Sequence, residues 1–480
     1  MNRRMICYLL GAILLIEAAF MLLPVVTALL YREANGWWFV YTMLGAALVG
    51  AAAMRFSRPR SKTIYARDAL VTVALSWIVL SLTGALPFTL SGEIPFYLDA
   101  VFEMISGFTT TGSSILTDVE ALSHCMLMWR SFSHWLGGMG ILVFMMAIVR
   151  LEGGQGIHLL RAESPGPTVD KMVPRMVDSS KILYTIYFAL TFILIIFYLA
   201  GGMPLFDALC NAFGTAGTGG FAIKASSFGG YSYYAQTVTT VFMILFGVNF
   251  SIYFFLLRRK YDLALKNTEL RWYLIIIFAS IAAITVNILH MFPTAYDALH
   301  HAAFAVSSVI TTTGYGTVDF NLWPELSRVI LVFLMLIGAC AGSTGGGLKV
   351  SRAVILFKAI QKQLRLLIAP HTVKTIKIDG KRVSEDTIQS VSNYFLLYVL
   401  LMLISILLVS LDNFDGTTTV TAVITTFNNI GPGLGLVGPA GNFAAFSPLS
   451  KLVMCLDMLF GRLELYPMVV LLLPSTWTRK

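Results

Sequence analysis

Four short turns of threonine and glycine recur along the sequence, and their residue types suit the binding of a partly dehydrated cation. Backbone carbonyls can replace the water shell of an ion where the chain is extended and bare of bulky side chains. Glycine permits the dihedral angles that point successive carbonyls the same way, and threonine hydroxyls can add ligands. The residues of the four turns are, in order, Thr109, Thr110, Thr111 and Gly112; Thr218, Gly219 and Gly220; Thr311, Thr312, Thr313 and Gly314; and Asn428, Asn429, Ile430 and Gly431.

The spacing of the turns predicts one ring built from four repeats. Their last glycines are separated by 108, 94 and 117 residues, and each turn lies between two long apolar segments. A short apolar stretch headed by an aspartate precedes each turn, and we expect Asp99 to cap a short helix that ends at Phe108. The turn cores hold no carboxylate and one filter glycine each, which favours a short filter for monovalent cations over a divalent site. The four aspartates are Asp99, Asp207, Asp297 and Asp415.

A second set of unusual residues lies about midway along the returning apolar segment of each repeat. In the third repeat the glycines are dense enough to unwind a helix. In the fourth, Gly461 precedes Arg462, the only arginine or lysine deep inside a predicted span. Gly137 and Gly247, in the first two repeats, fit close helix packing equally well. The interruption in the third repeat includes Gly338, Gly342, Ser343, Thr344, Gly345, Gly346 and Gly347.

The composition places these features in a membrane. The chain has 480 residues, 57% hydrophobic and 12% charged, with a mean hydropathy of +0.77, and its apolar runs can cross a hydrocarbon core of about 30 Å. We predict an all-α integral membrane protein. The ten expected spans lie near Met5–Leu30, Trp37–Met54, Ala69–Phe88, Met126–Val149, Ile182–Leu199, Val238–Leu257, Trp272–Leu289, Val329–Phe357 (interrupted), Tyr394–Leu411 and Leu452–Leu473.

The predicted architecture is four tandem units of helix, pore loop and helix around one pseudo-fourfold pore, preceded by two extra transmembrane helices. The expected divisions are 1–60 for the N-terminal helices, then 61–155, 156–262, 263–370 and 371–480 for the four repeats, the third of which carries the interruption.

The net charge of +9 is concentrated in alternate loops. By the positive-inside rule these loops and both termini are cytoplasmic, so the turns enter from the outer face. Because membrane topology already explains the basic loops, we do not expect a nucleic-acid partner. The basic stretch 358–389 is a candidate docking surface for a soluble partner or for anionic lipid headgroups, although topological retention explains it equally well.

The sequence gives little support to enzyme chemistry. No acid–base or nucleophile constellation lies in the spans, and the five cysteines lack metal-ligand spacing. The string Gly433–Gly438 matches a dinucleotide motif but follows no strand. We therefore expect no cofactor in this chain and no catalytic residues, with a transported cation as the ligand of the turns.

The motifs together resemble a known family. TTTGSS at 109–114, AGTGGF at 216–221, TTTGYG at 311–316 and NNIGPGLG at 428–435 occur in order with CAGSTGGGLKVSR at 340–352 and MLFGRLELYP at 458–467. This combination, with WLGGMGILV and the stretch around Arg161, is similar to the TrkH family, the potassium-uptake pore subunits of bacterial Trk systems within the Trk/Ktr/HKT superfamily. The similarity extends over essentially the whole chain.

The resemblance implies potassium uptake across the bacterial inner membrane by a homodimer in which each protomer has its own pore. It implies a cytoplasmic ring of nucleotide-binding regulatory subunits of the TrkA type, so a nucleotide is expected on the partner alone. The family's filter glycines correspond to the last glycine of each turn, its gating loop to 338–347 and its arginine opposite that loop to Arg462. The second repeat departs from the pattern, with Gly217 and Gly219 where the first has Thr109 and Thr111.

We therefore hypothesise that K⁺ passes inward down its electrochemical gradient, with 338–347 as a flexible gate and Arg462 as an electrostatic barrier below the filter. Two alternatives stay open. A sodium-selective or ion-coupled symporter could share the architecture, and an alternating-access carrier of an organic solute also uses broken helices.

Overall fold

The structure is a computed structural model that describes residues 1–59, 64–138, 140, 176–369 and 375–478. Within these residues, six helical segments are long and apolar enough to cross a membrane, which confirms an all-helical membrane architecture. The first segment combines α1 (Arg3–Phe20) and α2 (Leu22–Tyr31). The others contain α3 (Gly36–Phe56), α4 (Ala66–Ser91), α9 (Met176–Ala200), α14 (Thr268–Ile288) and α18 (Glu385–Val409).

A short helix precedes each glycine turn, as the sequence predicts. With 12 to 16 residues and a rise of about 1.5 Å per residue, none of the four can cross a core of about 30 Å. Each ends where its turn begins, so the chain reverses inside the molecule. The four short helices are α5 (Tyr97–Phe108), α10 (Leu205–Gly217), α15 (Ala295–Ile310) and α19 (Gly416–Asn428).

The aspartates at the starts of these helices occupy two different positions. Asp415 is the N-cap of α19, where its carboxylate accepts the Thr418 N–H at 2.9 Å. The prediction that Asp99 caps α5 is wrong, because the cap is Phe96 and Asp99 lies in the first turn. A carboxylate there still faces the positive end of the helix dipole, and it also pairs with Lys451 at 2.7 Å.

The returning segment of every repeat is a half-length helix that stops at the unusual residues. The first, α6, ends at Gly138, and the predicted positions 141–149 of its span lie outside the described residues. In the second repeat α12 (Phe250–Leu257) turns by 90° from α11, so a continuous helix over Val238–Leu257 is wrong. The half-helix of the third repeat, α16, ends before the interruption. That of the fourth repeat, α20, ends before α21 (Leu465–Leu472). These half-helices are α6 (His124–Gly138), α11 (Tyr233–Phe246), α16 (Glu325–Ile337) and α20 (Pro448–Leu463).

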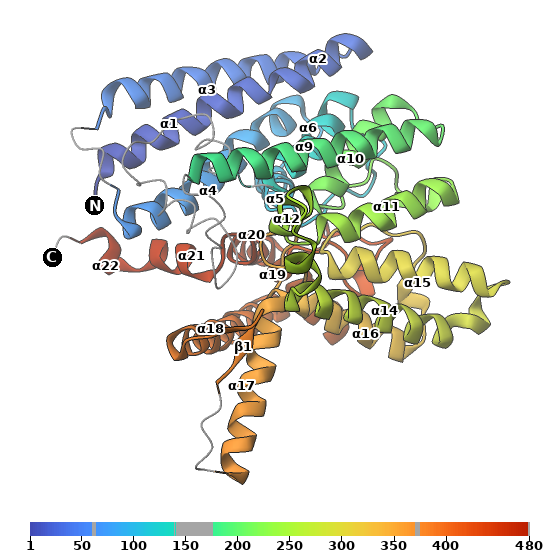
Figure 1. The fold of residues 1–480 in the computed structure, drawn as a ribbon. Coiled ribbons are helices and arrows are strands. Elements are labelled where there is room, and N and C mark those ends of the chain that lie inside the picture. Colours follow the sequence, from blue (N-terminus) through green and yellow to red (C-terminus); the bar gives the residue numbers. More distant parts are fainter. Residues whose placement is uncertain (60–63, 139, 141–175, 370–374, 479–480) are drawn as a thin grey trace.

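The remaining elements surround the repeats. In Figure 1, α1–α3 lie together along one side, both termini lie at the same end, and α17 (Val350–Ile368) projects away from the helical body. The strands β1 (Lys377–Ile378) and β2 (Lys381–Arg382) follow in the chain and pair antiparallel beside α17, where Lys358 donates to the Lys377 carbonyl at 2.7 Å. Short helical turns complete the fold: α13 (Tyr261–Leu265), α22 (Pro474–Trp477) and the 3₁₀ turns 227–230, 289–291, 320–322, 410–412 and 435–437.

Glycine at two of the helix breaks allows backbone to contact backbone. A Cβ atom on Gly137 would overlap the Phe108 carbonyl oxygen at the end of α5, and one on Gly461 would overlap the Phe427 carbonyl oxygen in α19. The two readings of Gly137, a helix break and close packing, therefore both hold.

We predict that Gly137→Ala lowers the unfolding temperature of the detergent-purified protein by several degrees. The added methyl meets backbone, which cannot rotate away, and overpacking of this kind costs about 1–3 kcal/mol. Gly45→Ala is the matched control, because Gly45 is also helical and a Cβ there meets nothing within 4 Å. Equal unfolding temperatures for the two variants, measured by size-exclusion chromatography after heating, would contradict the packing role.

Candidate functional site

All four turns share one backbone conformation. A left-handed residue lies two places before each final glycine, with φ of 57°, 53°, 58° and 56° at Thr110, Thr218, Thr312 and Asn429. Such angles are rare for β-branched residues such as threonine, so surrounding structure must enforce them. The final glycines have φ of 83°, 77°, 88° and 96°, a region that L side chains seldom adopt. In repeat order they are Gly112, Gly220, Gly314 and Gly431.

The same hydrogen bond fixes each turn to its short helix. The residue before the final glycine donates its backbone N–H to the carbonyl five residues earlier, at 2.8 to 3.0 Å. This is the longer bond of a Schellman-type helix ending, which satisfies a carbonyl that the helix leaves free. The four pairs are Thr111 with Ser106, Gly219 with Gly214, Thr313 with Ser308, and Ile430 with Thr425.

The final glycine of each turn faces a carbonyl of the next turn. That carbonyl belongs to the residue just before the final glycine of the next turn. A Cβ atom on any of the first three would overlap that oxygen, and one on Gly431 would come within 3.0 Å of the Thr111 oxygen. Because the fourth turn faces the first, the order closes on itself. The contacts are Gly112 with Gly219, Gly220 with Thr313, Gly314 with Ile430, and Gly431 with Thr111. The structure thus brings the four predicted turns together as a ring of backbone.

Threonine hydroxyls support this ring from within the turns. Thr109 donates to the Ile105 carbonyl at 2.6 Å and lies 2.8 Å from the Thr111 hydroxyl. The equivalent pair in the third repeat, Thr311 and Thr313, is 2.7 Å apart. These hydroxyls are engaged in holding the turns, so we assign them to support of the backbone more than to direct ion ligation. In the fourth repeat the Asn429 amide donates to the Thr111 hydroxyl at 2.8 Å.

The interruption of the third repeat lies directly against the turns. The Gly346 N–H donates to the Thr312 hydroxyl at 2.6 Å. A Cβ atom on Gly345 would lie 2.9 Å from the Thr311 carbonyl oxygen, and one on Gly346 would lie 2.5 Å from the Asn428 oxygen. The loop therefore contacts the turns of the third and fourth repeats. It also contacts the break between α11 and α12, where the Phe250 N–H donates to the Gly342 carbonyl at 3.0 Å.

Hydrogen bonds close the neck of this loop. The Lys349 N–H donates to the Ile337 carbonyl at 2.9 Å, and the Val350 N–H donates to that of Ala339 at 3.1 Å. Glu269, which is buried on α14, accepts the Ala341 N–H at 2.7 Å and the Ser351 N–H at 3.0 Å through one oxygen. One carboxylate thus holds both ends of the loop.

Arg462, in the fourth repeat, forms hydrogen bonds with the third and the first repeats. Its guanidinium donates to the Thr344 carbonyl in the loop at 2.7 Å, to the Gly138 carbonyl at 2.8 Å and to that of Gly137. The last two carbonyls lie at the end of α6, where the Gly137 carbonyl also accepts the Gly140 N–H at 3.2 Å.

The expectation that Arg462 would be the only deep arginine or lysine is wrong. Arg130, Lys349 and Arg352 are buried, whereas Arg462 is partly buried. Arg130 pairs with Glu103 at 2.6 Å, and Arg352 pairs with Glu464. These two arginines were missed because each finds its acid on a different element, which spacing along the chain does not reveal. His134 and Glu269 were missed because their partners are backbone groups on other elements.

Comparison with known proteins decides the family. A family model described as TrkH, cation transport protein, matches residues 39–478. The chain belongs to the TrkH family. TrkH-family relatives include the Trk system potassium uptake protein TrkH of Salmonella typhimurium and that of Escherichia coli K12, each 35% identical over 99% of this chain and all of the relative.

The fold agrees with that of a solved TrkH-family structure. The crystal structure of the potassium transporter TrkH from Vibrio parahaemolyticus has 33% sequence identity and a TM-score of 0.90, and the match covers 100% of both chains. The fourfold repeat architecture and the resemblance are confirmed. The relatives are named as transport proteins and not as enzymes, in keeping with the absence of catalytic motifs from the sequence.

We predict that Glu269→Ala loosens the interrupted loop. The substitution leaves two partly buried N–H groups without their acceptor, at a cost of up to about 1–3 kcal/mol each. In a chain whose single cysteine is Cys340, which is fully buried, the rate of maleimide labelling should rise roughly tenfold or more. Glu385→Ala is the control, because the Glu385 side chain is 62% exposed and pairs with Lys362 at the surface. An unchanged labelling rate in folded protein would remove Glu269 from this role.

Proposed function

We propose that this TrkH-family protein conducts K⁺ into the cell through the ring of four turns. The proposal rests on the ring of contacts between the turns. In this ring each filter glycine faces the carbonyl of the residue before the next filter glycine, and the fourth turn faces the first. A ring of carbonyls can substitute for water around a monovalent cation. The four short helices end at the ring, so their negative dipole ends favour a cation there. The names of the potassium-uptake relatives point to the same ion.

The interrupted loop serves as the gate and Arg462 as the barrier in this proposal. The loop contacts the turns of the third and fourth repeats. A guanidinium held below a narrow filter opposes cations most strongly where water is excluded. Both would have to give way, or be bypassed, for ions to pass.

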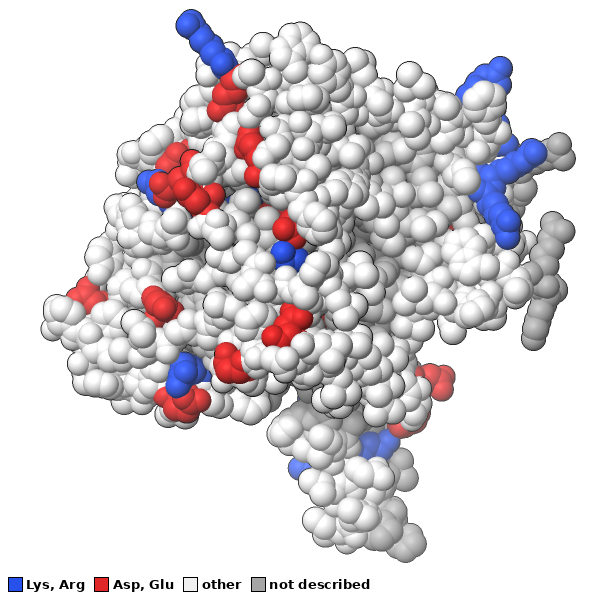
Figure 2. Space-filling model, turned by 180° about the vertical axis from the view of Figure 1, so that it is seen from behind, with Lys and Arg blue, Asp and Glu red and all other residues white. Residues whose placement is uncertain are grey.

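The proposed orientation places the turns toward the outside and both termini in the cytoplasm of a bacterium, across its inner membrane. Charge placement supports it. In Figure 2 most acidic side chains lie toward the left of the molecule and the largest basic group lies at the right edge, the end that carries the termini in Figure 1. An acidic outer face would raise the local cation concentration.

The proposed assembly is a homodimer with a cytoplasmic nucleotide-binding regulatory subunit of the TrkA type. Support comes from the family resemblance and from the basic residues of the stretch that contains α17 and the β1–β2 hairpin; α17 projects away from the helical body in Figure 1. The nucleotide would bind the partner, and this chain would need no cofactor beyond the transported ion. The proposed partners include the lipid bilayer and exclude nucleic acid.

Direct flux measurement tests the filter. Liposomes that hold the purified chain should take up K⁺ and Rb⁺ in preference to Na⁺ and Li⁺. Gly314→Ser should lower the K⁺ over Na⁺ ratio by roughly tenfold, because the new side chain overlaps the Ile430 carbonyl at a φ of 88°. Gly316→Ser is the matched control, since its Cβ would meet only Pro439 at 3.4 Å and Val318 at 3.8 Å.

The outcomes separate the alternatives. Equal competition by Na⁺ and K⁺ would favour the sodium or coupled symporter. If no cation moves, the assay is repeated with the regulatory subunit and nucleotide, and silence there too would refute conduction. Uptake of an organic solute would favour the alternating-access carrier.

We predict that Arg462→Ala raises basal K⁺ flux roughly tenfold, because it removes a positive charge from the proposed path. Arg462→Lys keeps the charge but loses the planar fork that reaches three carbonyls, so its flux should stay close to that of the wild type. Arg365→Ala, an exposed position on α17, is the control. Unchanged or reduced flux in folded Arg462→Ala protein would refute the barrier.

A further inference from the structure

The second turn lacks the hydroxyl pair that supports the first and third. The first and third turns each have a threonine three residues before the final glycine and another one residue before it. The second turn has Gly217 and Gly219 at these two positions. Its backbone nevertheless has the same left-handed residue and the same helix-ending hydrogen bond. Some other group must therefore hold it in place.

The imidazole of His134 lies where the second of those threonine side chains would be. A Cβ atom on Gly219 would overlap three atoms of the His134 ring, and one on Gly217 would overlap the His134 carbonyl oxygen. His134 is fully buried on α6, in the first repeat. His134 of the first repeat thus fills the space beside two glycines of the second, with its ring at Gly219 and its backbone at Gly217.

Both ring nitrogens of His134 are used, each toward a different repeat. Nδ1 lies 2.7 Å from the Gly107 carbonyl oxygen, at the end of α5. Nε2 lies 3.2 Å from the backbone nitrogen of Phe221, the residue after the second filter glycine. A carbonyl can only accept and an amide can only donate, so Nδ1 carries the proton and Nε2 accepts. The ring is neutral and bridges the two turns.

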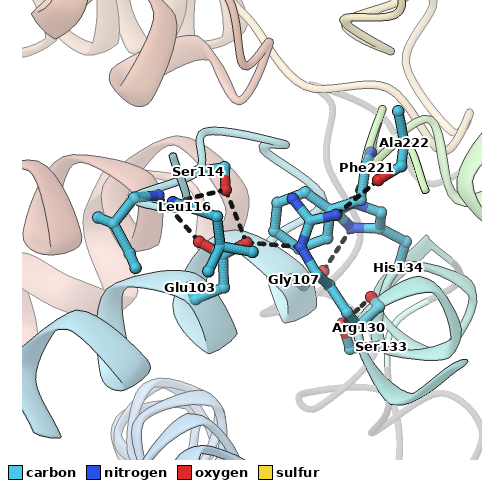
Figure 3. Close-up of polar contacts among 10 residues, drawn as sticks. Glu103, Gly107, Ser114, Leu116, Arg130, Ser133, His134, Phe221 and Ala222 are labelled. Carbon is cyan, nitrogen blue, oxygen red and sulfur yellow. Dashed lines mark hydrogen bonds and ion pairs between the residues drawn. The ribbon is translucent and has the colours of Figure 1, made fainter. Parts of the chain in front are cut away.

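Arg130, one helical turn before His134, continues the bridge, as Figure 3 shows. Its guanidinium lies 3.5 Å from the centre of the Phe221 ring and donates to the Ala222 carbonyl at 2.8 Å. It also pairs with Glu103, whose carboxylate accepts the Ser114 hydroxyl and the Ile115 N–H just beyond the first filter glycine, each at 3.0 Å. One face of α6 therefore holds the outer limbs of two neighbouring turns.

We propose that His134 is a positioning residue that sets ion selectivity, because it replaces the missing threonine pair and holds the second turn at the spacing of the first and third. The inference deepens the proposed conduction through this ring and rests on it. His134 would not touch the ion. It acts through the backbone of Phe221, so its loss would widen or soften one quarter of the ring.

The test is the K⁺ over Na⁺ flux ratio in liposomes for a series of variants, with Gly314→Ser alongside. His134→Ala should lower the ratio roughly fivefold or more, since two hydrogen bonds are lost. His134→Gln keeps one donor and one acceptor and should stay close to wild type. His134→Leu fills the space without hydrogen bonds and should behave like the alanine variant. His290→Ala, at an exposed position, is the control.

A compensating change gives the sharper readout. Gly219→Thr alone should lower the ratio, because its side chain overlaps the imidazole. Gly219 does not have a positive φ, so threonine is otherwise allowed there. Combined with His134→Ala, the same threonine should raise the ratio above that of His134→Ala alone. A role in folding alone would reduce protein yield or total flux and leave the ratio unchanged.

The outcomes are distinguishable from failure of conduction itself. If the wild type selects K⁺ and Gly314→Ser relaxes it, but folded His134→Ala and His134→Leu keep the wild-type ratio, the positioning role is refuted and the filter stands. If the wild type does not discriminate among cations, the proposed function fails and the role of His134 fails with it.

Discussion

Backbone touches backbone around the ring of turns, and most of the architecture follows from that closeness. Each final glycine meets a carbonyl of the next turn at a distance that leaves no space for a side chain. A contact made by main chain alone cannot adapt by changing rotamer, so the surrounding helices must fix it from behind. The short helices do so through identical helix-ending bonds, and the half-helices do so through glycines such as Gly137 and Gly461 that let them approach.

The four repeats reach the same backbone geometry with different side chains. Threonine pairs support the first and third turns. His134 of α6 supports the second turn. The fourth turn is supported by Asn429, whose amide donates to the Thr111 hydroxyl and to the Met458 carbonyl. What is common to the repeats is therefore the conformation and not the composition. This explains how turns that differ in sequence can form a ring with nearly equal angles, and why its symmetry is only approximate.

Local signals in the sequence were enough to predict the turns, the short helices and the breaks, because glycine, apolar runs and helix-starting aspartates act within a few residues. The order of the ring was beyond reach, since it depends on contacts between residues about a hundred positions apart. Hydropathy also overstated the returning spans. A run such as Val238–Leu257 is apolar throughout, yet the chain bends by 90° near Gly247. The sequence did not single out His134, because its partners Gly107 and Phe221 contribute only backbone groups.

The helix breaks also determine which part of the proposed gate can move. Arg462 donates to the Gly137 and Gly138 carbonyls at the end of α6. The same guanidinium bonds the loop through the Thr344 carbonyl. If the loop withdrew, the arginine would lose this acceptor and keep the two at the end of α6. Of these three bonds, withdrawal of the loop breaks one, whereas movement of the arginine breaks all three; withdrawal would also break the bond from the Gly346 N–H to the Thr312 hydroxyl. In the proposed path the loop is the mobile element, and the guanidinium keeps its place on the wall.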